Sequence, residues 1–249
     1  MRRLLLLVPL LVGMLALTGV SAVSAQAEEP EFGQCVKASP KKSGKYSDKS
    51  CQNGVAEGGK FDWSPINPID PIGFNDEDRG ATFRYFGFIV ICPKSESTTL
   101  ILGPRDVITR IVYVDCTLHR LIYCNSAEAA AGTIETSSLT GTLGYIARET
   151  HEVGVDYTGE GGVIARFQCG SEPPVTLKGS VIAKVTGDVN KMSSKSDATF
   201  EEKGGTQVPD ELEGGIPDTP IAEIGGEEGP ATITAVEKES GKEKIEIKG

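Results

Sequence analysis

The chain has few residues of the kinds that perform nucleophilic catalysis. It contains two histidines, His119 and His151, and no G-x-S-x-G sequence to present a serine at a sharp turn. Nucleophilic catalysis needs a serine or cysteine beside an oriented base. His151 precedes Glu152, but the H-E-x-x-H spacing of zinc proteases is missing. We therefore expect both histidines to be ordinary surface or turn residues, and we assign no catalytic residue.

Carboxylates offer a second route to chemistry, because a pair of them can cleave a glycosidic bond. The chain has 35 acidic residues, and Asp115 and Asp156 stand at the ends of strand-like runs. They are the candidates for such a pair in a secreted hydrolase acting on a glycan. Nothing in the sequence sets their separation, so the hydrolase is the alternative hypothesis.

Oxygen-bearing side chains also gather in the segment NDEDRG at 75–80. Calcium loops place oxygen ligands at alternate positions, with a glycine at the bend and a bidentate glutamate further on. That glutamate is missing here, and Arg79 opposes a cation. No C-x-x-C pair indicates zinc. We expect a solvated turn at 75–80, and neither a metal nor a cofactor.

The compartment follows from the first 27 residues. Arg2 and Arg3 precede an apolar run from Leu4 to Leu17, and small residues then lead to Ala25-Gln26-Ala27. A basic start, a short apolar middle and an A-x-A exit are typical of a secretory signal peptide. The run is shorter than the ~20 residues of a membrane span. We expect residues 1–27 to be a signal peptide and residues 28–249 to be a single secreted β domain without a transmembrane anchor.

Export determines how the six cysteines are interpreted, because an oxidising compartment favours disulfides. Six cysteines allow fifteen pairings in sets of three. Proximity in sequence favours Cys35–Cys51 and Cys116–Cys124, which leaves Cys92–Cys169. The alternative joins Cys92 to Cys116 and Cys124 to Cys169. The sequence predicts three disulfides and leaves their connectivity open.

Charge limits the partners. The net charge is −10, and loss of Arg2 and Arg3 with the leader gives −12. An acidic chain repels the phosphate backbone, so we expect no nucleic-acid partner. Trp63, Phe61 and Tyr46 provide aromatic side chains near a lysine-rich N-terminal stretch. Aromatic rings of this kind hold sugars or protein partners when exposed, although packing in the core is their commoner role.

The remaining pattern is that of strands. TFRYFGFIVIC (82–92) and VITRIVYVDC (107–116) are rich in β-branched and aromatic residues, with Gly87 as a candidate bulge. PVTLKGSVIAKV (174–185) alternates apolar and polar residues, and helix signals are nearly absent. Short strands separated by turns favour an all-β fold, an antiparallel sandwich or barrel.

Three segments depart from this pattern. Residues 28–80 are rich in turns and prolines, which predicts an irregular N-terminal segment. Residues 201–230 are acidic and rich in glycine, which indicates a loop or linker within the domain. ATITAVEK (231–238) and EKIEIKG (243–249) flank a Ser-Gly pair, which predicts a C-terminal hairpin.

Several motifs resemble those of a group of uncharacterised, secreted, β-rich actinobacterial proteins. The matching residues are EFGQC (31–35), GKY (44–46) with Cys51, Cys124 with GTI (132–134), LTGTLGYI (139–146), VGVD (153–156) and GSVI (179–182). The resemblance covers most of residues 31–185 and fades in the acidic end. It implies export and a β architecture, and it transfers no activity and no functional residue.

Together these observations favour an exported, disulfide-stabilised and non-catalytic binding or structural protein. We expect it in the medium or in the cell envelope, with an extracellular glycan or protein as its partner.

Overall fold

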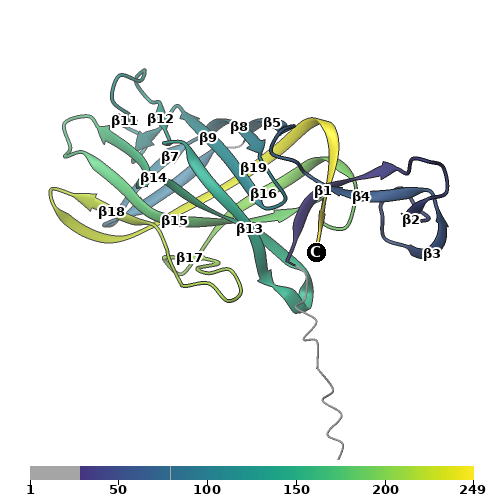
Figure 1. Ribbon diagram of the computed structural model, residues 1–249. Coiled ribbons are helices and arrows are strands. Elements are labelled where there is room, and N and C mark those ends of the chain that lie inside the picture. The colour runs from purple at the N-terminus through teal and green to yellow at the C-terminus, as the bar shows by residue number, and fades with distance from the viewer. Residues whose placement is uncertain (1–28, 79) are drawn as a thin grey trace, which may run out of the picture.

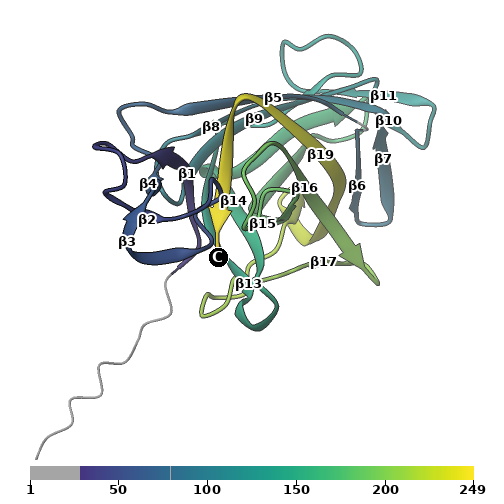
Figure 2. The same cartoon turned by 90° about the vertical axis from the view of Figure 1, so that its right-hand side faces the viewer.

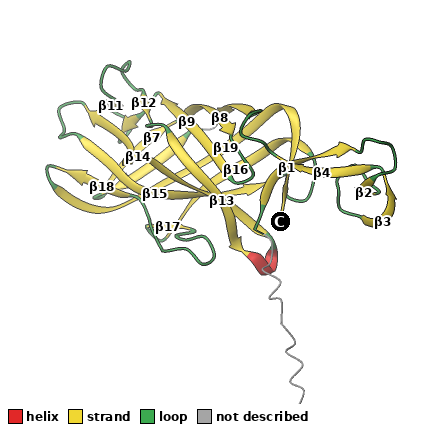
Figure 3. Ribbon diagram, viewed as in Figure 1, coloured by secondary structure: helices red, strands yellow, loops and turns green. Residues whose placement is uncertain are grey.

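The computed structural model describes residues 29–78 and 80–249, and the expected signal peptide at 1–27 lies outside them. The regular secondary structure of the described chain is strand, apart from one short 3-10 turn, η1 (Arg148–Thr150), which confirms the all-β prediction (Figure 3). The strands are β1 (Glu31–Lys37), β2 (Gly44–Tyr46), β3 (Gly54–Gly59), β4 (Phe61–Pro65), β5 (Ile72–Asp78), β6 (Ala81–Tyr85), β7 (Phe88–Cys92), β8 (Lys94–Ile101), β9 (Asp106–Val114), β10 (Thr117–Leu118), β11 (Ile122–Asn125), β12 (Ile134–Glu135), β13 (Leu139–Ala147), β14 (Glu152–Cys169), β15 (Val175–Thr186), β16 (Ser193–Lys203), β17 (Thr206–Val208), β18 (Ile221–Ile224) and β19 (Glu227–Lys248).

The strands close into a barrel. A first ring runs β5–β8–β9–β13–β14–β15–β16–β19, and β19 returns to β5 through Ser240↔Asn75 and Gly241↔Phe74. Every pairing in this ring is antiparallel. A closed ring leaves no free sheet edge, so the architecture is a barrel rather than a sandwich.

A second closed ring continues the first along the same axis. It runs β6–β7–β10–β11–β14–β15–β18–β19 and returns from β19 to β6, again with every pair antiparallel. The long strands β14, β15 and β19 belong to both rings and join them into one elongated barrel (Figures 1 and 2). Val153 of β14 lies in the first ring and Phe167 in the second. They pair with Val185 and Val175 of β15, which are ten residues apart, so the two positions are roughly 33 Å apart at ~3.3 Å per residue.

The N-terminal segment is more regular than predicted. β1 pairs with β19 and with β4, and β4 continues to β2 and β3. This small sheet projects from one end of the barrel, beside the C-terminal end of the chain (Figure 1). Its strands are short and interrupted by lysine-rich turns, which is why no clear alternation marks them in the sequence. Residues 66–71, which include Pro68 and Pro71, are irregular as expected.

The C-terminal hairpin prediction is wrong, because β19 is one strand of 22 residues. Its first half pairs with β6, β16 and β18, and its last residues pair with β1. The Ser-Gly pair marks a bend where the register against β16 shifts, between Lys195↔Ser240 and Ser193↔Ile245. Each half finds its own partner strand, so the chain bends there instead of folding back.

A hairpin occurs instead in the run 82–92. Gly87 is not a bulge: Phe86 and Gly87 both have positive φ, at 46° and 80°, and form the two-residue turn between β6 and β7. Positive φ at both central positions is the signature of the tight turn that matches strand twist.

The acidic segment 201–230 is part of the barrel rather than a free linker. β17 and β18 lie within it, and β18 pairs with both β15 and β19. Its connecting loop is tied to β13 by the Glu213 amide, which donates to the Tyr145 carbonyl at 2.7 Å. Leu212 also packs over Gly144 of β13. These contacts are long-range, so composition alone could not reveal them.

The structure contains three disulfides, Cys35–Cys51, Cys92–Cys116 and Cys124–Cys169. The favoured pairs Cys92–Cys169 and Cys116–Cys124 are wrong, and the alternative connectivity is right. The reason is that the other four cysteines lie in a row across four neighbouring strands, in the same order as along the chain. The outer two are three strand spacings apart, roughly 14 Å, beyond the ~7 Å that a disulfide can bridge.

The interior of the barrel contains both apolar and polar side chains. Phe83, Tyr113 and Phe167 pack in a connected group inside the barrel, with ring centroids 5.0 and 6.1 Å apart. The first ring adds buried polar groups, including a hydrogen bond of 2.8 Å between the hydroxyls of Thr99 and Thr109. Among the described residues, no helix has the length and apolarity needed to cross a bilayer.

Candidate functional site

The two histidines lie far apart and exposed. His119 is in the turn between β10 and β11, and its ring centroid is 6.2 Å from that of Phe88. His151 follows η1 at the opposite end of β14. Both adopt positive φ, at 50° and 54°, so each serves a tight turn.

The proposed carboxylate pair does not form. Asp156 pairs with Thr142, which pairs with Asp106 at the start of β9, whereas Asp115 follows the end of β9. The nine residues from 106 to 115 span roughly 30 Å. Glycoside hydrolysis needs two carboxyl groups within ~10 Å. Asp115 instead forms an ion pair of 3.3 Å with Lys94.

Residues 75–78 of this segment form the end of a strand rather than a calcium loop. β5 extends to Asp78 and pairs with β8 along its whole length. Gly80 has φ +79°, and a Cβ there would lie 1.9 Å from the Cys92 carbonyl oxygen, so the glycine permits close strand packing. The structure of residues 29–78 and 80–249 contains no cluster of three or more His, Cys, Asp or Glu side chains suited to a metal.

The structure does bring two of the three candidate aromatics together. Tyr46 of β2 and Trp63 of β4 line a pocket of 820 Å³ between the small N-terminal sheet and the end of the barrel. Tyr145 of β13 forms part of the opposite wall. Phe61 pairs with Tyr46 across the sheet but does not line this pocket in the described structure. We call this the aromatic pocket.

Lys248 is central to the geometry of the aromatic pocket. Its Nζ donates to the Tyr46 hydroxyl at 2.6 Å and to the Cys51 carbonyl at 3.4 Å. The same ammonium lies 4.3 Å from the Tyr46 ring centroid and 5.2 Å from that of Trp63. A cation within ~6 Å of an aromatic ring is attracted by its quadrupole. Lys248 therefore holds both rings in place.

The indole of Trp63 also packs against strand β1. A Cβ built on Gly33 of β1 would lie 2.3 Å from Cζ2 of the indole, so the ring lies flat against the backbone of that strand. Its Nε1 donates to Glu31 at 3.4 Å. The side chain remains partly exposed, so part of the ring stays available to a ligand.

Polar groups complete the aromatic pocket. Three carboxylates, Glu29, Glu31 and Asp62, and a second lysine, Lys45, line it. Glu29 is held by Arg148 at 2.8 Å and by Arg105 at 3.6 Å. Asp62 accepts from the Lys45 amide at 3.0 Å. The carboxylates are therefore oriented acceptors, as in pockets that read polar ligands.

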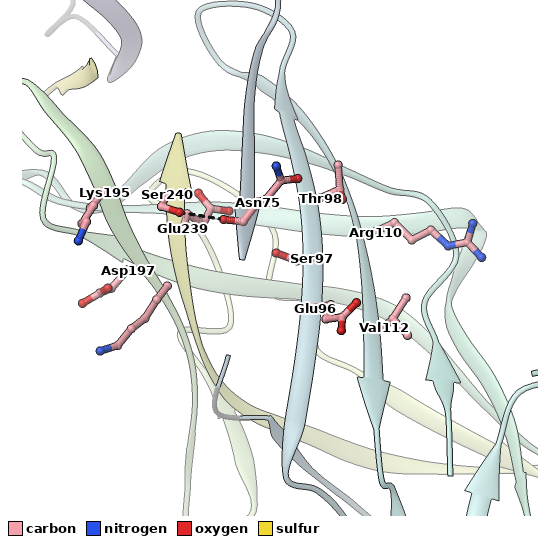
Figure 4. A pocket seen from close by; sticks show the side chains of 11 residues that line it. Asn75, Glu96, Ser97, Thr98, Arg110, Val112, Lys195, Asp197, Glu239 and Ser240 are labelled. Carbon is pink, nitrogen blue, oxygen red and sulfur yellow. Dashed lines mark hydrogen bonds between the residues drawn. The ribbon is translucent and has the colours of Figure 1, made fainter. Parts of the chain in front are cut away.

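A second depression, a cleft of 860 Å³, lies where β5 meets β19 (Figure 4). The Ser240 hydroxyl donates to the Asn75 carbonyl at 3.3 Å in its middle. Lys195 and Asp197 lie on one side of this bond, and Arg110 and Val112 lie on the other (Figure 4). Arg110 is paired with Glu135. The described residues that line the cleft include no aromatic side chain, so it lacks the apolar surface that usually carries ligand affinity.

An acidic side chain is buried inside the first ring, close to this cleft. Asp188, in the turn between β15 and β16, is 1% exposed. Burial and the nearby charges of Glu239, Asp197 and Glu246 raise its pKa to about 8. A hydrogen bond with its own backbone acts in the opposite direction. Its Oδ1 has no hydrogen-bond partner among the described residues. A cavity of 10 Å³ beside it has room for about one water molecule.

Sequence reasoning identified Tyr46 and Trp63 but missed Lys248, Tyr145 and Glu29. No family model, curated protein or solved structure matches this chain. The site is therefore interpreted from its own geometry.

Proposed function

We propose that this is an exported, non-catalytic binding protein that holds a neutral oligosaccharide in the aromatic pocket. The observation that carries the proposal is the placement of Tyr46 and Trp63 around Lys248, with oriented carboxylates at the rim. Sugar rings present C–H faces that stack on aromatic rings, and hydroxyls that bond to carboxylates and ammonium groups. The pocket offers both kinds of surface, and its 820 Å³ lies in the range of ligand sites.

The charge of the pocket and of the whole chain favours neutral rather than acidic sugars as ligands. Three carboxylates and two lysines face the pocket, and the whole chain carries −10. An acidic polysaccharide would be repelled by both. The expected leader and the three disulfides support an extracellular location, where such glycans occur.

Isothermal titration calorimetry with chitotetraose, cellotetraose and maltotetraose tests the proposal. We expect saturable binding of at least one of these tetrasaccharides. Tyr46→Ala should weaken it by about three- to tenfold, equivalent to the ~0.5–1.5 kcal/mol of an aromatic contact. Tyr123→Ala is the matched control, because Tyr123 is 57% exposed at the other end of the barrel. Equal weakening by both variants would contradict the assignment.

The same samples test the absence of catalysis. Each bound tetrasaccharide should be recovered intact after prolonged incubation, because the structure does not bring Asp115 and Asp156 together. Release of shorter saccharides would restore the hydrolase hypothesis.

If Tyr46→Ala does not fold, Tyr46→Phe removes only the hydroxyl that accepts from Lys248, and it should still weaken binding.

A further inference from the structure

The end of the barrel opposite the aromatic pocket contains another cavity, of different chemistry. It has a volume of 220 Å³ and is walled by side chains from six strands, including Tyr85, Phe88, Leu118, Val175 and Ile224. Glu172 is the one charged residue among the described residues of its lining. We call it the apolar mouth, because it opens at the free end of the second ring.

Aromatic contacts build one wall of the apolar mouth. The Tyr85 ring lies 5.8 Å from Phe88 and 5.9 Å from Phe167, measured between centroids. Tyr85 is buried, and burial together with the Glu172 charge raises its pKa to about 12. Its hydroxyl therefore remains a neutral phenol at every physiological pH.

The rim of the apolar mouth is held rigid. The disulfide Cys124–Cys169 joins β11 to β14 beside it, and Cys92–Cys116 braces β7 on the same wall. The turn after Cys169 is fixed by the Glu172 amide, which donates to the Cys169 carbonyl at 3.0 Å, and by Gln168, whose Nε2 donates to the Glu172 carbonyl at 2.9 Å. A cavity that is already formed binds with little loss of ordering entropy.

The turns at this end of the barrel also expose apolar side chains. Phe86, Leu121 and Tyr123 lie in or beside the turns at this end, and they are 44%, 85% and 57% exposed. Exposed apolar residues scattered singly are common, and here three of them lie at the end of the barrel that contains the apolar mouth.

We propose that the apolar mouth binds one small, uncharged and mainly apolar molecule, such as a substituted aromatic ring or a short alkyl chain. Size supports this class, because an apolar cavity of ~150 Å³ already accommodates benzene and 220 Å³ leaves room for a substituent. Glu172 at the rim adds a preference for a ligand that carries a hydrogen-bond donor. This site is independent of the aromatic pocket, which lies at the other end of the barrel.

Toluene and p-cresol are suitable probes for calorimetry. We expect both to bind, with the negative heat-capacity change of apolar burial. p-Cresol should bind about threefold more tightly, because its hydroxyl can donate to Glu172. Glu172→Ala, on an exposed turn, removes the acceptor and should abolish that difference while leaving toluene binding unchanged. Failure of either probe to saturate overturns the proposal.

A cavity-filling variant locates the site. Ile224→Trp places an indole in the apolar mouth and should weaken toluene binding more than tenfold. Ile216→Trp is the matched control, because Ile216 is 88% exposed in the loop before β18 and should leave binding unchanged. Unchanged toluene binding in a folded Ile224→Trp protein contradicts the proposal. If Ile224→Trp does not fold, the comparison of wild type with Glu172→Ala decides.

Two further measurements distinguish toluene bound in the apolar mouth from toluene bound elsewhere. Toluene should not alter the fluorescence of Trp63, the one tryptophan of the chain, since Trp63 lines the aromatic pocket at the opposite end of the barrel. A change in that fluorescence would place toluene in the aromatic pocket instead. Size-exclusion chromatography should give the same elution volume with and without toluene. A dimer that toluene dissociates would show that a second copy occupies the apolar mouth.

Discussion

Gly33 supports the indole of Trp63 across the small N-terminal sheet, because a Cβ on residue 33 would lie 2.3 Å from Cζ2 of the ring. The glycine is required by this close approach and not by its backbone angle. A cross-strand aromatic ring that covers a glycine is a recognised way to pin strand register. Gly33 and Trp63 thus fix one wall of the aromatic pocket.

Gly33→Ala should displace the indole and lower the free energy of unfolding by about 1–3 kcal/mol, as overpacking does. Gly54→Ala is the matched control, since a Cβ there meets nothing closer than 4.0 Å. It should change stability by less than ~0.5 kcal/mol. Chemical denaturation and the emission maximum of Trp63 measure both effects. Equal stability of the two variants would show that the indole does not lie on Gly33.

The disulfides should differ in their contribution to stability. Their sequence separations are 16, 24 and 45 residues for Cys35–Cys51, Cys92–Cys116 and Cys124–Cys169. The chain-entropy model gives about 3, 3.5 and 4 kcal/mol in that order. Replacing each pair with alanine and measuring denaturation tests the order. Non-reducing peptide mapping should show these three links and no free thiol, and a Cys92–Cys169 peptide would contradict the row of cysteines.

Asp188 should make stability depend on pH. Its pKa is raised from 3.8 to about 8 in the folded state, so the folded protein binds more protons than the unfolded chain between these values. The free energy of unfolding should therefore fall as the pH rises from about 4 to about 8. Asp156 and Glu246, whose pKa values burial also raises, contribute in the same direction.

Asp188→Asn removes the largest of these contributions. The variant should be less sensitive to pH across the same window, and denaturation at pH 5 and pH 8 measures the difference. Asp210, in an exposed position of the loop before β18, provides the control in Asp210→Asn. A wild-type protein whose stability rises between pH 5 and pH 8 would contradict the burial of Asp188 inside the barrel.

Binding in the aromatic pocket should depend little on salt. A neutral oligosaccharide binds through hydrogen bonds and stacking contacts, neither of which is screened by ions. Raising NaCl from 50 to 500 mM should change the affinity less than threefold. A loss of tenfold or more would indicate a charged ligand held by Lys45 or Lys248.

The fold class followed from local pattern. In 175–185, Val175, Leu177, Val181 and Ala183 are buried, and Lys178 and Lys184 are not, as the alternation predicts. Such strands are visible because each residue's face is set by its immediate neighbours. The path of β19 was not visible, because a Ser-Gly pair serves equally for a hairpin turn and for a bend within one strand. Only its distant partners, β1 and β16, decide between the two.

The site was predictable in part, for the same reason. Tyr46 and Trp63 are close in sequence and could be noted together. Lys248 lies 202 residues after Tyr46, and closure of the barrel onto β1 is what places them in contact. The cysteine connectivity failed in the same way, because sequence distance is a poor guide once four strands stand side by side.

Titration of the intrinsic fluorescence of Trp63 tests the central claim most directly. The chain has one tryptophan, and it lines the aromatic pocket, so its emission reports on that site alone. The proposal predicts a saturable change in intensity or wavelength with a neutral tetrasaccharide, with the same midpoint as the calorimetric titration. Calorimetric binding that leaves the emission of Trp63 unchanged would place the saccharide elsewhere and contradict the assignment.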